Sequence, residues 1–204
     1  ICTYQGRRTT VSFRLLGSLL QNDRCGLSIS KRTMVEEQKL SERHESMRGW
    51  FAYELHALMR DDSRIWVVTG DLGFGMFDKV KRDFPERFVN VGAAEQAMVG
   101  VGVGLAIEGK IPVVYSITPF LLYRPFEAIR NYLNRDGIPV KLVGSGRNRD
   151  YGHDGFSHWA EEDRRVMQIF SGIEAFWPET KEEVPEILDL VLASSRPCYL
   201  NLRK

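Results

Sequence analysis

The sequence has few cysteines, and their arrangement excludes two classes of protein. Cys2, Cys25 and Cys198 are the only three, and they lie far apart in a chain of 204 residues. An odd number of widely spaced cysteines is neither a disulfide framework nor a CxxC metal site. The fold must therefore rest on an ordinary core, for which a hydrophobic content of 43% is sufficient.

The sequence also lacks an excess of charge and a long hydrophobic run. Its 28 Lys and Arg residues balance 27 Asp and Glu residues, which gives no electrostatic reason to expect a nucleic-acid partner. The most apolar stretch, 97–107, has about 11 residues, whereas a helix needs about 20 to span a bilayer. We therefore expect no nucleic-acid partner and no membrane partner.

Residues 1–33 differ from the rest of the chain in charge. They carry six basic residues and one acid, Asp23, and are rich in Ser and Thr. This composition is typical of an organellar transit peptide, but it also fits upstream sequence that is not native, which we favour. We predict a basic and polar extension over 1–45, a domain over 46–204 and a cytoplasmic location, with organellar targeting as the alternative.

From Ser46 onward, short apolar runs alternate with longer amphipathic segments. The runs predict strands over 65–69, 87–91, 111–116, 139–143, 173–177 and 198–202. The segments predict helices over 46–58, 94–107, 120–134, 161–170 and 181–193. Such alternation builds a parallel sheet, so we expect an α/β fold of about six parallel strands with helices on both faces.

Sheets of this kind bind ligands in the crevice beyond the carboxyl ends of their strands. Glu95 follows the strand 87–91 and falls in the first turn of the next helix. It is either a carboxylate placed favourably at a helix N-terminus or a desolvated carboxyl that can give a proton to a ligand. In the same helix, the spacing of Gly100 and Gly104 leaves one face bare for close packing.

Two further segments at strand ends are rich in functional side chains. Phe120 and Tyr123 lie three residues apart just beyond a strand, and they either pack in the core or stack on a flat ring. The loop 144–158 holds four glycines, two histidines and two aspartates, which packing alone does not explain. Its histidines and aspartates match no metal-site spacing, so we assign no metal site.

Several segments together resemble the pyrimidine-binding domain of transketolases. In chain order they are GDLG at 70–73, FPERFVNVGAAEQ at 84–96, GKIPVVYS at 109–116, FExxRN at 126–131, VKLVGSG at 140–146 and YGxDGxSH at 151–158. Their order and spacing are specific, and the resemblance covers roughly 47–204. It implies the thiamine diphosphate-binding fold, in its pyrimidine domain.

The resemblance implies a cofactor, thiamine diphosphate, and residues that bind it. Glu95 would face N1′ of the aminopyrimidine and share a proton with it, which makes Glu95 both a cofactor-binding and a catalytic residue. Phe120 would stack on the pyrimidine ring. Tyr123 would lie in the same pocket wall, and Asp71 would lie near the cofactor.

The resemblance also implies residues that bind a sugar substrate. Asp154 and His158 fall where transketolases hold the donor hydroxyls and the C1–C2 region, and His158 would be the second catalytic residue. Arg147 stands beside the position of a family histidine that contacts sugar phosphates, so it is a candidate substrate-binding residue.

The resemblance further implies a partner. Transketolases hold the diphosphate and its divalent ion through a GDG…N motif, and only GDL occurs here, at 70–72. We expect a diphosphate-binding subunit that supplies the ligands for Mg²⁺ or Ca²⁺, in a heterotetramer with two copies of each chain. The assembly would transfer a two-carbon ketol unit from a ketose or ketose phosphate to an aldehyde-type acceptor.

Two alternatives remain at this point. One is another reaction of the same cofactor, such as 2-oxoacid decarboxylation or acyloin condensation. The other is a catalytically silent homologue that binds a partner chain.

Overall fold

The computed structural model describes residues 45–204, so the extension expected over 1–45 lies, but for its last residue, outside the described residues. The first described helix is α2 (Met47–Asp61), which begins where the sequence predicts. The hydroxyl of Ser46 accepts a hydrogen bond of 3.1 Å from the N–H of Gly49. This is the standard side-chain cap for the unpaired N–H groups of a first helical turn.

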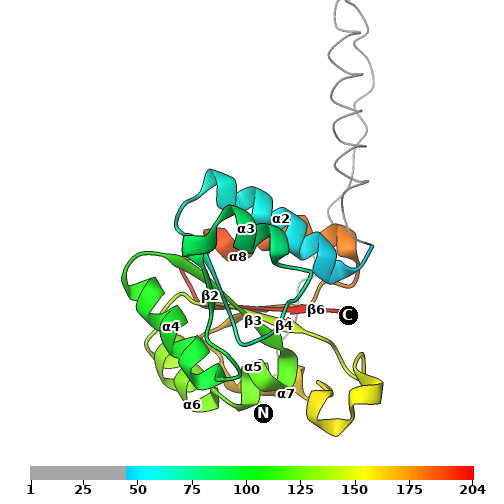
Figure 1. Ribbon diagram of the computed structural model, residues 1–204. Helices are drawn as coiled ribbons and strands as arrows, with labels where there is room; N and C mark the ends of the chain where they lie inside the picture. Colours follow the sequence, from blue (N-terminus) through cyan, green and yellow to red (C-terminus); the bar gives the residue numbers. More distant parts are fainter. Residues whose placement is uncertain (1–44) are drawn as a thin grey trace, which may run out of the picture. The chain divides into compact units, whose positions relative to one another are not determined.

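A six-stranded sheet forms the centre of the described part (Figure 1). Its strands are β1 (Ile65–Thr69), β2 (Phe88–Asn90), β3 (Ile111–Ile117), β4 (Lys141–Ser145), β5 (Glu174–Phe176) and β6 (Cys198–Leu202). They lie in the order β2-β1-β3-β4-β6-β5, and every neighbouring pair is parallel. In register, Val67 of β1 lies between Phe88 and Val113. The prediction of about six parallel strands is confirmed.

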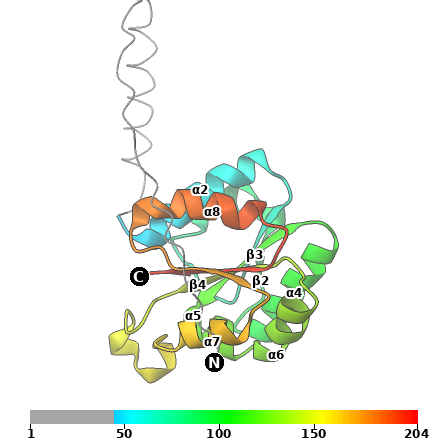
Figure 2. The ribbon, with the colours of Figure 1, turned by 180° about the vertical axis from the view of Figure 1, so that it is seen from behind.

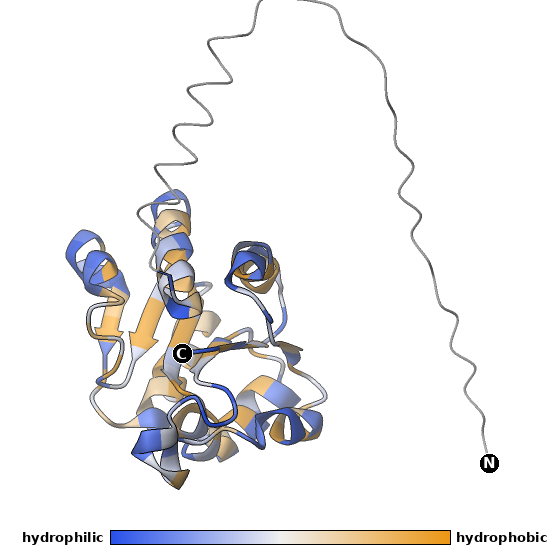
Figure 3. Cartoon of the chain, turned by 90° about the vertical axis from the view of Figure 1, so that its right-hand side faces the viewer, coloured by the Kyte–Doolittle hydropathy of each residue, from blue (hydrophilic) through white to orange (hydrophobic). Residues whose placement is uncertain are grey.

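Helices cover both faces of the sheet, as Figures 1 and 2 show. One face carries α2, α3 (Asp78–Asp83) and α8 (Val184–Ala193), and the other carries α4 (Glu95–Ile107), α5 (Thr118–Tyr123), α6 (Phe126–Ala128) and α7 (Asp163–Ile169). Side chains alternate along a strand, so Val113 and Tyr115 enter the first core and Val114 enters the second. The strands are hydrophobic, as expected of a sheet buried on both faces (Figure 3).

The prediction of one continuous helix over 120–134 is wrong, because the structure has three segments there. Pro125 has no N–H to bond the preceding turn, so α5 ends at Tyr123 and the chain resumes as α6. A π-helical segment, η2 (Ile129–Arg135), follows directly. Single 3-10 turns complete the description: η1 (Pro85–Arg87), η3 (Gly152–Asp154), η4 (Phe156–His158) and η5 (Lys181–Glu183). None of the helices in 45–204 is long and apolar enough to cross a bilayer.

Helix α4 packs closely against the sheet at Gly102. A Cβ atom at this position would lie 2.7 Å from Cγ2 of Val114 and 3.3 Å from Cγ1 of Val140. Gly100 and Gly104 are exposed, and a Cβ there would meet nothing within 4 Å in the described part of the chain. Within the described residues, the close packing that the sequence placed at Gly100 and Gly104 is therefore made at Gly102.

Candidate active site

The carboxyl ends of the strands bring together residues from distant parts of the sequence. The strand order reverses between β1 and β3, and open α/β sheets bind ligands at such a switch point. The segments after β2, β3 and β4 carry Glu95, Phe120 and His158. In both ribbon views the segment after β4, drawn in yellow, lies at the same edge as the end of β6 (Figures 1 and 2).

Glu95 is a buried carboxyl in the first turn of α4. Its side chain is 4% exposed, and one of its oxygens, Oε1, accepts a hydrogen bond of 2.6 Å from Nη1 of Arg124. Arg124 follows the last residue of α5, and its side chain is 48% exposed. The helix N-terminus therefore holds Glu95 as expected, but the carboxylate is also paired with a cation from another helix.

Arg124 also contacts an aromatic ring. Its guanidinium carbon lies 3.8 Å from the ring centroid of Phe120, a cation–π contact. Phe120 in turn contacts His158: their rings meet edge to face, with centroids 4.9 Å apart. Glu95, Arg124, Phe120 and His158 thus form one continuous series of contacts, which we call the Glu95–His158 row.

Tyr151 supports the end of this row. Its ring centroid lies 6.2 Å from that of His158, and its hydroxyl lies 2.8 Å from the hydroxyl of Ser145. Arg48 donates a further hydrogen bond of 3.1 Å to the Tyr151 hydroxyl. Gly146 has φ +88°, and a Cβ there would lie 2.5 Å from the Tyr151 ring. This glycine therefore lets the ring pack against the backbone and hold the loop 146–158, which follows β4.

Sequence reasoning did not single out Arg124 or Tyr151. Arg124 stands four residues after Phe120, a spacing that puts two side chains on the same face of a helix. This spacing from Phe120 would have indicated Arg124 as a further candidate site residue. Tyr151 belongs to a matched motif, but nothing in the sequence shows that its ring packs beneath His158.

Tyr123 points toward α7. Its hydroxyl donates a hydrogen bond of 3.3 Å to Oε2 of Glu162, which precedes the first turn of α7. Partial burial, with the nearby Glu162 carboxylate, raises the pKa of Tyr123 to about 12. The phenol therefore stays protonated at neutral pH. The structure joins Tyr123 to Glu162, and Phe120 to the Glu95–His158 row.

The two predicted aspartates lie in exposed turns. Asp71 has φ 59°, and its N–H donates a 2.9 Å hydrogen bond to the side chain of Asn90, whose amide bonds back to the Asp71 carboxylate at 3.1 Å. This reciprocal pair joins the ends of β1 and β2. The carboxylate of Asp154 lies 3.3 Å from Nε2 of His153. The described residues contain no group of three His, Cys, Asp or Glu that could hold a metal ion.

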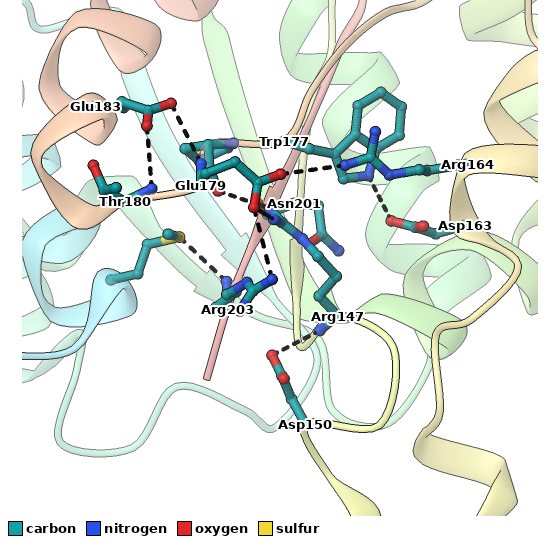
Figure 4. Close-up of polar contacts among 12 residues, drawn as sticks. Arg147, Asp150, Asp163, Arg164, Trp177, Glu179, Thr180, Glu183, Asn201 and Arg203 are labelled. Carbon is teal, nitrogen blue, oxygen red and sulfur yellow. Dashed lines mark hydrogen bonds and ion pairs between the residues drawn. The ribbon is translucent and has the colours of Figure 1, made fainter.

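Arg147 has its guanidinium engaged by the chain itself (Figure 4). Its side chain is 4% exposed; Nε donates to the side-chain oxygen of Asn201 at 2.9 Å, and Nη2 donates to the Pro178 carbonyl at 2.9 Å. The carboxylate of Glu179 lies 3.3 Å from Nη1. Burial lowers the pKa of Arg147. In this structure, Arg147 ties β6 to the segment after β5, and its geometry does not support the substrate contact expected from the sequence.

Asn201 of β6 braces two walls of the site. Its side-chain amide lies 3.1 Å from both Oγ1 of Thr118 and the Gly146 carbonyl oxygen, and Thr118 donates a 2.7 Å bond to that same carbonyl. Thr118 begins the helix that carries Phe120, and Gly146 begins the loop that carries His158. The separation of these two walls is therefore fixed by buried hydrogen bonds behind the site.

Comparison with known families settles the relationship. The model of the transketolase pyrimidine-binding domain matches residues 44–204. The chain belongs to this family. Its residues 45–204 therefore have the pyrimidine-domain fold, as the sequence resemblance implied.

Similar proteins include individual subunits of transketolases. The chain is 36% identical over 121 residues to a subunit of the apulose-4-phosphate transketolase of Actinobacillus succinogenes, covering 59% of this chain and 39% of that protein. It is 30% identical over 142 residues to the 6-deoxy-6-sulfo-D-fructose transketolase subunit SqwH of a Clostridium species, covering 69% and 44%. The chain thus spans less than half the length of these relatives.

A solved structure has the same fold. It is described as a split gene transketolase in an inactive beta4 tetramer, and it is 29% identical with a TM-score of 0.69. The match covers 78% of this chain and 51% of that one.

Proposed function

We propose that this chain is the pyrimidine-binding subunit of a thiamine diphosphate-dependent, transketolase-type enzyme. The enzyme transfers a two-carbon ketol unit from a ketose or ketose phosphate to an aldehyde-type acceptor. The observation that carries the proposal is the buried Glu95 carboxyl, joined through Arg124 to the Phe120 ring, at the strand ends of a domain of this family.

The residues present fit the cofactor. A carboxyl that is 4% exposed, in the first turn of α4, is placed to share a proton with a ring nitrogen of a ligand bound beside it. Phe120 offers a ring for stacking, because the flat guanidinium of Arg124 already lies over it, 3.8 Å from its centroid. When bound, thiamine diphosphate would supply the electron sink for carbon–carbon bond cleavage.

The chain's other candidate residues have roles at the rim. Asp154 and His158 lie in the loop after β4, where a sugar can reach them, and Ser157 lies 3.0 Å from Nδ1 of His158. We assign them to the hydroxyl groups and the C1–C2 region of the donor sugar. Asp71 and Tyr123 are assigned to the cofactor side of the crevice.

A partner subunit would complete the site. The relatives named as transketolase subunits support this arrangement. We place the diphosphate-binding residues and the ligands for Mg²⁺ or Ca²⁺ on that partner, in a heterotetramer, and we propose that the enzyme works in the cytoplasm.

The test combines cofactor binding with turnover. Thiamine diphosphate and Mg²⁺ are titrated by calorimetry into the chain alone and into its complex with the co-purifying subunit; we expect tight binding only by the complex. Glu95→Gln cannot deliver a proton, so kcat with ketose donors should fall by about 100-fold or more, while cofactor affinity falls less.

Glu108→Gln is the matched control, because Glu108 is an exposed carboxylate at the far end of the same helix. It should leave both quantities unchanged. Equal turnover by Glu95→Gln would remove Glu95 from catalysis. Turnover of pyruvate without ketose activity would favour decarboxylation, and no turnover by any complex would favour a silent homologue.

A further inference from the structure

Arg124 lies between the two groups to which the aminopyrimidine is assigned. One end of its guanidinium donates the 2.6 Å bond to Glu95, and its central carbon lies 3.8 Å from the centroid of the Phe120 ring. Both groups are thereby engaged by one arginine. A guanidinium is flat, carries N–H donors and stacks on aromatic rings, so it offers the same contacts as an aminopyrimidine.

The two partners of this ion pair are unequal in their freedom to leave it. The Glu95 side chain is 4% exposed and is fixed in the first turn of α4, so an unpaired carboxylate there would be costly. The Arg124 side chain is 48% exposed, so its guanidinium can turn into solvent and keep its own charge hydrated. Only the arginine can be exchanged for another group.

We propose that Arg124 occupies the pyrimidine position before the cofactor binds, and that cofactor binding exchanges the guanidinium for the aminopyrimidine. This inference rests on the proposed function and assigns a role to a residue outside the expected site. Arg124 is thus a displaceable placeholder that keeps Glu95 paired and the Phe120 ring covered.

The exchange has a defined proton balance. In the ion pair Glu95 is a carboxylate, whereas a hydrogen bond donated by Glu95 to a ring nitrogen requires the acid. Arginine keeps its own proton at all accessible pH values, so the proton must come from solvent. Each cofactor bound should therefore take up about one proton. Among the described residues Arg124 is the one charged group within ion-pair distance of this carboxyl, and the next titratable group in the row, His158, contacts Phe120.

The experiment measures affinity and proton uptake together. Thiamine diphosphate is titrated into the Mg²⁺-loaded complex at one pH, in two buffers with different ionisation enthalpies. The wild type should take up about one proton per cofactor. Arg124→Met keeps the length of the stem but removes the competitor, so affinity should rise about tenfold and proton uptake should fall toward zero.

Two variants serve as controls. Arg124→Lys keeps the charge and should keep the proton uptake. Arg130→Ala removes an exposed arginine that bonds its neighbour Asn131, and it should change neither quantity. Weaker cofactor binding by Arg124→Met, or unchanged proton uptake, would overturn the exchange.

A second measurement separates this proposal from the proposed function. In the complex stripped of cofactor, Arg124→Met should lower Tm by about 2–4 °C, and it should lower Tm by much less in a Glu95→Gln background. Equal shifts in both backgrounds would overturn the placeholder role while leaving the proposed function intact. A wild-type complex that binds no thiamine diphosphate would overturn the proposed function, and the exchange with it.

Discussion

Gly102 gives a sharp test of how α4 packs on the sheet. Gly102→Ala would place a methyl group 2.7 Å from Cγ2 of Val114, well inside the 3.5–4.0 Å at which carbon atoms normally meet. Val114 is fully buried in β3, between β1 and β4, and its branched side chain has little rotameric freedom. The contact can be relieved only by moving the helix away from the sheet.

The size of the effect follows from two opposed contributions. Alanine is favoured over glycine in a helix interior by about 1 kcal/mol. Overpacking a tight core costs about 1–3 kcal/mol. We expect Gly102→Ala to range from neutral to about 2 kcal/mol less stable. Gly100→Ala and Gly104→Ala, where a Cβ has open space, should be about 0.5–1 kcal/mol more stable.

Urea unfolding of the complex or the folded chain measures these differences, with each kcal/mol also shifting Tm by about 2–4 °C. The three variants change the same residue type within one helix, so propensity is common to all of them and cancels. The remaining difference in unfolding free energy between Gly102→Ala and the other two variants therefore measures the contact with Val114. If all three variants were equally stabilised, the close approach of α4 to β3 would be refuted.

Two further predictions concern buried cations. Arg147→Lys can replace at most one of the bonds to Asn201 and Pro178, so the free energy of unfolding should fall by about 2–4 kcal/mol. Arg149→Lys, in an exposed ion pair, should change it by less than about 0.5 kcal/mol. If Arg147→Lys instead raised KM for the sugar without loss of stability, Arg147 would be a substrate-binding residue. Burial lowers the pKa of Lys141 below its usual 10.5. Between the lowered pKa of the folded chain and the usual pKa of the unfolded chain, the unfolded chain binds more protons, so the contribution of Lys141 to stability rises with pH. Urea unfolding between neutral pH and pH 10 should show that Lys141→Met lacks this rise; identical pH dependence would contradict the burial of its charge.

Much of the fold could be predicted because a parallel sheet buried on both faces leaves an obvious pattern. The apolar runs 65–69 and 198–202 coincide with β1 and β6, because every side chain in such a strand is covered. The break at Pro125 was missed because the hydrophobic spacing continues on both sides of it. Helix α3 was missed because it is short and highly charged, and its burial rests on Val80.

The site could be predicted only as far as backbone topology determines it. Glu95, Phe120 and His158 all follow strands of a parallel sheet, so their meeting at one edge follows from the fold. The orientation of Arg147 could not be predicted, because a loop position does not reveal whether an arginine points inward to Asn201 or outward to a ligand. Arg124 was overlooked because its pairing with Glu95 depends on side-chain reach across two helices.

The brace made by Asn201 has a consequence for how this domain can diversify. Because Thr118 and Gly146 are locked together from behind, the wall that carries Phe120 does not depend on the composition of the outer loop. The short turns η3 and η4 in that loop are closed by their own backbone bonds. On the proposed function, substitutions at the loop tip would therefore alter substrate choice over evolutionary time while the wall that carries Phe120 retains its geometry.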